Sequence, residues 1–255
     1  MYNNTIGLVS VSGFYKVIDD LFHQMYNVSI DNVDSLFRTM GMSWQSTAPY
    51  DNIIHQRNLH FLYLPYNSNH TSYAWGFEFE HQMNFGFLPG YLSNIVLSYN
   101  FSITRSETYI IGSRTDTTHS MVIGPRGDTS NVDIYHHVPV DFKRVSEGQP
   151  NFYGNAAIGY DIGGFSARLS VFYQDQYVLQ YSQDGQSDIY TDSFSKWDLS
   201  FKQKITENIA VLLNINNLTN KEETTSFKNN KTPWQIPRTA ELYGTTADIG
   251  VRITL

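Results

Sequence analysis

The feature that most constrains this chain is a period-two alternation of apolar and polar residues that recurs along the sequence. It is clearest at the C-terminus, where the odd positions from Tyr243 to Leu255 are mostly apolar. The even positions between them are polar or glycine and include Asp248 and Arg252. Because successive side chains of a β-strand point to opposite faces, the pattern predicts strands with one apolar and one polar face.

Eight segments follow this rule, and most are long for a soluble sheet, in which strands average about five or six residues. The predicted strands are residues 9–16, 73–84, 95–104, 151–162, 165–177, 196–205, 209–216 and 243–255. Short, turn-rich connections alternate with long polar ones at roughly 19–70, 109–141, 182–193 and 221–241. Short turns at one end and long loops at the other are typical of bacterial outer-membrane barrels.

The composition supports strands that face two solvents and excludes several function classes. Charged residues make up 16% of the chain and aromatic residues 15%, whereas about 25% charged residues is usual in soluble domains. No stretch of 18 apolar residues exists, so the sequence predicts no transmembrane helix. The net charge of −7 argues against a nucleic-acid partner, and the absence of cysteine excludes disulfides and thiolate sites.

Several short motifs, in the same order as in a known family, resemble the TonB-dependent outer-membrane receptors over about residues 70–255. They are WGFE at 75–78, LPG at 88–90, YNFS at 99–102, GQP at 148–150, NINNLTN at 214–220 and DIGVR at 248–252. The resemblance implies a 22-stranded barrel plugged by an N-terminal domain, of which this chain supplies the last eight strands. The strand count then places the beginning and the end of the chain on the periplasmic side.

We therefore expect an all-β fold: an antiparallel meander of about eight long strands, part of a transmembrane β-barrel, open or incomplete as a fragment. Residues 1–255 are interpreted as the C-terminal portion of the receptor barrel. The plug domain is expected to be absent. A signal peptide is expected to be absent too, because the first ten residues show no basic region followed by an apolar one.

The resemblance implies TonB-dependent uptake of a scarce nutrient at the bacterial cell outer membrane, and no enzyme activity or cofactor. The implied partners are outer-membrane lipid, the TonB complex through the missing plug domain, and a small ligand such as a siderophore. A vitamin, an oligosaccharide or a peptide is an open alternative. A self-contained eight-stranded barrel with an anchoring or adhesion role, or a hydrolase, also stays open, although no GxSxG motif is present.

The candidate ligand-binding residues are two carboxylates and several loop aromatics. Glu78 and Glu80 share one face of a strand, so they form either an acid/base or cation site or a pair of lumen charges neutralised by Lys16 or Arg105. The aromatic candidates in the long loops either stack on a ligand or pack the loops against each other. They are Trp44, Tyr63, Tyr66 and Trp234.

Other aromatic and histidine residues receive structural interpretations. Six aromatics near predicted strand ends suit the headgroup layer of a membrane, namely Tyr73, Trp75, Tyr177, Tyr181, Trp197 and Tyr243. The eight histidines lack HExxH-like spacing, and His136 and His137 point to opposite sides of a strand. We therefore expect neither a metal site nor catalytic residues.

Overall fold

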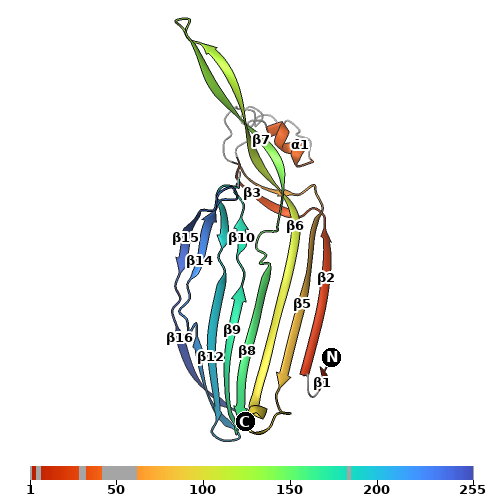
Figure 1. Cartoon of the computed structure of the whole chain (residues 1–255), viewed down its shortest axis with the longest axis vertical. Helices are drawn as coiled ribbons and strands as arrows, with labels where there is room; N and C mark the ends of the chain where they lie inside the picture. The colour runs from red at the N-terminus through yellow and green to blue at the C-terminus, as the bar shows by residue number, and fades with distance from the viewer. Residues whose placement is uncertain (1, 4–6, 29–32, 42–61, 183–184, 255) are drawn as a thin grey trace.

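The computed structural model describes residues 2–3, 7–28, 33–41, 62–182 and 185–254, and a curved antiparallel sheet dominates it (Figure 1). We call its eight long strands the wall. The wall strands are β2 (Gly7–Ile18), β5 (Ser72–Asn84), β6 (Ile95–Ile123), β8 (Phe152–Ile162), β9 (Phe165–Gln174), β12 (Phe194–Lys204), β13 (Ile209–Asn216) and β16 (Thr246–Ile253). A short strand, β1 (Tyr2–Asn3), pairs with β2 at the edge.

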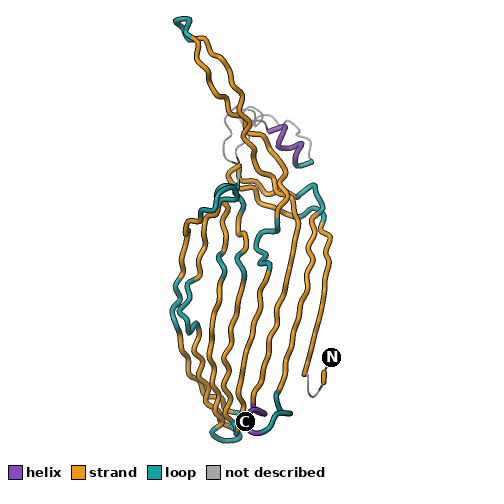
Figure 2. The backbone as a smooth tube through the Cα atoms, in the orientation of Figure 1, coloured by secondary structure: helices purple, strands orange, loops and turns teal. Residues whose placement is uncertain are grey.

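Each of the eight predicted strands corresponds to one wall strand, and the wall strands are neighbours in chain order. The short turns between them gather at one end of the sheet, where both ends of the chain also lie (Figure 2). One of these turns contains the 3₁₀-helix η1 (Gly90–Asn94). Among the described residues, β2 and β16 do not pair with each other. The expectation of an open antiparallel meander is confirmed, and a closed eight-stranded barrel is not what the chain forms.

The pairing register keeps the apolar side chains of neighbouring strands on one face of the wall. Phe79 pairs with Phe101, while the next position along each strand pairs Glu80 with Asn100. Aromatic rings on the apolar face pack from strand to strand at centroid distances of 5.4 to 6.2 Å. One face is thus apolar and the other polar over most of the sheet, as expected of strands that face two solvents.

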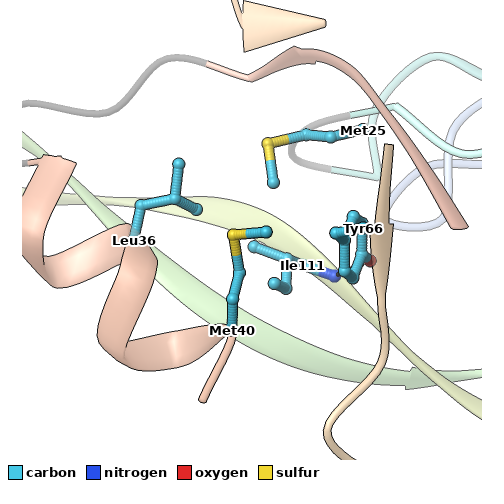
Figure 3. Packing of buried hydrophobic residues seen from close by; sticks show 5 residues of the cluster. All are labelled: Met25, Leu36, Met40, Tyr66 and Ile111. Atoms are coloured by element: carbon cyan, nitrogen blue, oxygen red, sulfur yellow. Dashed lines mark hydrogen bonds between the residues drawn. The ribbon is translucent and has the colours of Figure 1, made fainter. Parts of the chain in front are cut away.

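The buried apolar core lies beyond the long-loop end of the wall rather than against its apolar face. Its larger cluster contains Met25, Leu36, Met40, Tyr66 and Ile111, which come from distant parts of the chain (Figure 3). On the wall itself, Ile249 and Val251 are 76% and 64% exposed. In the described part of the chain, no second layer packs on the apolar face, so the wall is not half of a soluble sandwich.

We call the elements around this core the cap. They are β3 (Phe22–Val28), α1 (Val33–Thr39), β4 (Leu62–Asn67), β10 (Tyr177–Gln180), β11 (Asp188–Thr191), β14 (Glu223–Lys228) and β15 (Gln235–Glu241). The sequence predicted loops here, and that prediction was wrong in part. These strands have four to seven residues, too few for their alternation to stand out. Most pair within one connection, and the β11–β14 pair joins two of them. No described helix is long and apolar enough to cross a membrane.

The predicted loop at 109–141 is also wrong, because it forms a long two-stranded ribbon. The outer part of β6, from Thr108 to Ile123, pairs residue by residue with β7 (Thr129–Arg144). β6 is therefore one strand that runs through the wall and continues far beyond the cap (Figure 1). Threonine, valine and isoleucine are frequent in this segment, and their branched side chains favour extended backbone.

Candidate ligand-binding site

A cleft lies where the ribbon leaves the wall, and we call it the rim cleft. Its volume is about 350 Å³, within the range of small-molecule sites. The wall part of β6 supplies a serine and a glutamate, the ribbon strand β7 supplies two basic residues, and the cap supplies two tyrosines and an asparagine. The lining residues are Ser106, Glu107, Lys143, Arg144, Val145, Tyr181, Tyr190 and Asn230.

The two basic residues of the rim cleft differ in how their charges are satisfied. The ammonium of Lys143 lies 2.7 Å from a carboxylate oxygen of Glu107. The guanidinium of Arg144 instead stacks on two rings, with its carbon 5.2 Å from the Phe142 centroid and 5.6 Å from the Tyr181 centroid. Within the described residues Arg144 has no ion pair. Its N–H groups are therefore available to an anionic ligand.

Partly buried hydrogen bonds support the cap side of the cleft. The hydroxyl of Tyr181 donates to the carbonyl of Val145 at 2.9 Å, and its backbone N–H donates to Glu147 at 3.1 Å. Burial raises the pKa of the Tyr181 hydroxyl and of the Glu147 carboxyl. Asp188, which is fully buried, accepts a hydrogen bond from Asn230 at 2.5 Å. These hydrogen bonds orient Tyr181 and Asn230 at the edge of the cleft.

Glu78 and Glu80 lie on the polar face of β5, as the alternation predicted. Ser12 donates a hydrogen bond to Glu78 at 3.0 Å, and Gln82 donates one to Glu80 at 2.7 Å. The suggested pairing with Arg105 is wrong, because Arg105 pairs in register with Trp75 and so belongs to the other face. Among the described residues neither carboxylate forms an ion pair. Together they give this part of the polar face a negative charge.

The three loop aromatics that the structure describes do not meet in one place. Trp44 lies outside the described residues. Tyr63 is 66% exposed in β4 and Trp234 is 38% exposed just before β15. Tyr66 is only 5% exposed, and its hydroxyl accepts a hydrogen bond from the Ile111 N–H at 2.9 Å. Tyr66 therefore serves the cap core, and burial raises its pKa to about 12.

The comparisons with known proteins decide the family. A family model described as TonB dependent receptor-like, beta-barrel, matches residues 2–218. The chain belongs to the TonB-dependent receptor family. Its members are outer-membrane receptors and transporters rather than a class of enzymes. The wall of this receptor is thus part of a barrel, and the cap and ribbon are its long loops.

One solved structure was also found. The siderophore receptor PirA from Acinetobacter baumannii is 10% identical, with a TM-score of 0.32, over 75% of this chain and 34% of that one. The receptor chain therefore spans about a third of the length of PirA. The comparison with curated proteins gave no match.

Sequence reasoning missed the rim cleft of the receptor. Arg144, Tyr181 and Asn230 are separated by tens of residues, and no motif joins them. Tyr181 was assigned to the headgroup layer, which is wrong because its side chain is 9% exposed inside the cap. One signal could have indicated the cleft: the basic pair Lys143-Arg144 directly follows an aromatic residue in a chain with few charges.

A buried histidine makes the attachment of the cap to the receptor wall sensitive to pH. A ring nitrogen of His23 lies 2.9 Å from the Thr108 hydroxyl, which lies 2.9 Å from the Ser72 hydroxyl. Burial lowers the pKa of His23 below its usual 6.5. The folded cap therefore favours neutral His23, so its stabilisation is complete above pH 6.5 and is lost as pH falls from 6.5 through the lowered pKa.

We expect faster amide exchange in β3 and β4 at pH 5 than at pH 7.5, after correction for intrinsic exchange rates. Hydrogen-exchange mass spectrometry measures this effect. His23→Gln keeps a polar side chain without a titrating ring, so it should remove the His23 part of the pH step. Because His70 and Asp141, a second pair 3.1 Å apart, stay intact in this variant, the difference isolates His23. An unchanged pH step in His23→Gln would contradict the assignment.

Proposed function

We propose that the receptor binds a negatively charged nutrient chelate of the siderophore class in the rim cleft, as the first step of TonB-dependent uptake. Three observations support this function. The chain belongs to the TonB-dependent receptors. The cleft has a suitable volume, and its Arg144 carries a positive charge without an ion-pair partner among the described residues. This guanidinium, without an ion pair among the described residues, carries most of the argument, because it favours anionic over neutral nutrients.

The wall gives this function an orientation. Short turns face the periplasm and long loops face the outside in outer-membrane barrels, which supports a position of the cap and the rim cleft outside the cell. The apolar face of the wall would contact outer-membrane lipid, while the polar face, with Glu78 and Glu80, would line the lumen. Coupling to TonB would come through a plug domain that lies outside these 255 residues.

The function predicts that Arg144→Gln weakens chelate binding by about 10- to 100-fold, the equivalent of one or two hydrogen bonds to a charged group. The measurement is a titration of the detergent-solubilised chain with a ferric catecholate chelate, followed by tryptophan fluorescence. Cobalamin and a neutral oligosaccharide serve as competing ligand classes. The chelate should bind more tightly than either.

Arg114→Gln is the matched control, because Arg114 lies on the exposed ribbon and is already paired with Asp116 at 2.8 Å. It should leave the affinity unchanged. Equal losses in the two variants would mean that net charge, rather than the cleft, attracts the chelate. Preferential binding of a neutral ligand that is insensitive to Arg144→Gln would overturn the proposal.

A further inference from the structure

The far end of the ribbon is a tight turn with the sequence Gly124-Pro125-Arg126-Gly127-Asp128. The N–H of Gly127 donates to the carbonyl of Gly124 at 2.9 Å, and the N–H of Gly124 donates to the carbonyl of Asp128 at 2.7 Å. Gly127 has a φ of +80°, which L side chains rarely adopt. Proline at the second position and glycine at the fourth suit this turn, so the tip has a defined shape.

The tip carries two opposite charges that no described residue nearby pairs with. Arg126 and Asp128 are both exposed, and among the described residues neither forms an ion pair or a side-chain hydrogen bond. Elsewhere on the ribbon, by contrast, the exposed charges are paired. Arg114 lies 2.8 Å from Asp116, and His119 lies 2.7 Å from Asp133. Among the exposed charges of the described ribbon, those without an ion-pair partner are therefore the two at the turn.

The carboxylate of Asp128 has a definite place in the turn. A Cβ built on Gly124 would lie 2.6 Å from an Asp128 carboxylate oxygen, so the carboxylate rests against the bare backbone of Gly124. Around Gly127, in contrast, a Cβ would meet no atom within 4 Å. Gly127 therefore separates the two charged residues by an open stretch of backbone that a partner can approach.

The ribbon holds these charges far from the rest of the molecule. Sixteen residue pairs join Thr108–Ile123 to β7, and at about 3.3 Å per residue they span roughly 50 Å. Figure 1 shows the turn well beyond the cap, at the opposite end from the short turns. Met121, Ile123 and Tyr135, near the turn, are 59% to 71% exposed. A projecting point of this kind suits insertion into another protein better than capture of a small molecule.

We propose that the tip docks into a cell-surface receptor of another cell that binds a guanidinium in an acidic groove and a carboxylate through a divalent cation. Carboxylate oxygens are the ligands that Mg²⁺ and Ca²⁺ prefer, and an acidic groove pairs with the fork of an arginine. Integrins recognise the tripeptide Arg-Gly-Asp with this chemistry, so an integrin ectodomain is the matching probe. The docking shares one assumption with the proposed function, namely that the cap faces outside the cell.

The test is binding of the full 255-residue chain, in detergent micelles, to an immobilised integrin ectodomain in Mg²⁺ or in EDTA. We expect saturable binding that EDTA abolishes and that a linear Arg-Gly-Asp peptide competes away. Asp128→Glu keeps the charge but lengthens the side chain by one methylene, so it should weaken binding at least about tenfold, since each tenfold corresponds to about 1.4 kcal/mol. Arg126→Gln should weaken binding as well.

Asp116→Glu is the matched control, because Arg114-Thr115-Asp116 repeats the charge spacing on the same ribbon with its charges already paired. It should bind like the unchanged chain. Absence of Mg²⁺-dependent binding, or equal effects of Asp128→Glu and Asp116→Glu, would overturn the proposal. Chelate binding at the rim cleft is measured separately in the same preparation, so loss of one function is distinguishable from loss of the other.

Discussion

Arginine in place of Leu213 is expected to lower the free energy of unfolding in a lipid bilayer by about 2–4 kcal/mol. Leu213 lies within β13 and pairs with Phe201 on one side and Ile249 on the other. All three side chains belong to the apolar face of the wall. In the proposed orientation a charge introduced there enters the hydrocarbon of the membrane, where no water or counter-charge solvates it. Urea unfolding in phospholipid vesicles, followed by tryptophan fluorescence, measures the change.

Asn214→Arg is the control, since the neighbouring position faces the other way. Asn214 pairs with Ser200 and Asp248, and its amide donates to the Asp248 carboxylate at 3.2 Å. An arginine there meets polar groups and a negative charge, so we expect a change of less than about 0.5 kcal/mol. If the two variants were equally unstable, the assignment of lipid and lumen faces would be wrong.

Alanine in place of Asp188 is expected to destabilise the β10–β11–β14–β15 part of the cap by about 3–5 kcal/mol. The fully buried carboxylate accepts hydrogen bonds from the backbone N–H and the hydroxyl of Ser182, both at 2.8 Å, and from Asn230. The substitution removes three hydrogen bonds to a carboxylate, worth about 1.5–3 kcal/mol each, and the half-buried Ser182 and exposed Asn230 regain part of this from water. Hydrogen-exchange mass spectrometry should show much faster exchange in β10 and β11.

The effect of Asp188→Ala should remain local, because Asp188 belongs to the small cap sheet and not to the wall. Exchange in β12 and β13 is expected to stay unchanged. Asp133→Ala is a suitable control, since that carboxylate pairs with His119 on the exposed ribbon and such pairs contribute about 0–1 kcal/mol. The same exchange pattern in both variants would contradict the anchoring role of Asp188.

The wall could be predicted from the sequence because each of its strands lies between two solvents. Val251 is apolar because it lies on one face, and Asp248 is polar because it lies on the other. Residue type therefore alternates at every second position. The alternation gives the two faces of each strand, and the short turns make consecutive strands neighbours in the sheet. The pairing of Glu78 with Arg105 was wrong because Arg105 shares the parity of Ile103 and so lies on the apolar face.

The cap and the rim cleft could not be predicted, because their structure depends on contacts between distant segments. Tyr66 is buried only because α1 and Ile111 enclose it, and Ile111 is 45 residues away. Tyr181 has the same local sequence character as an interfacial tyrosine, yet it packs against Ile110 and Val178. These contacts leave no periodic pattern in the sequence. A tyrosine that binds a ligand therefore cannot be distinguished, from the sequence, from a tyrosine that is buried in a core.

The continuity of β6 has a mechanical consequence. Its inner part is hydrogen-bonded to β5 and β8, and its outer part to β7. Tension applied to the turn along the ribbon axis passes straight into the β5–β6–β8 ladder and loads it in shear. Rows of hydrogen bonds loaded in shear share the force, whereas those at a peeled edge break one after another. A cell tethered through this turn would transfer the drag of flowing liquid to the barrel.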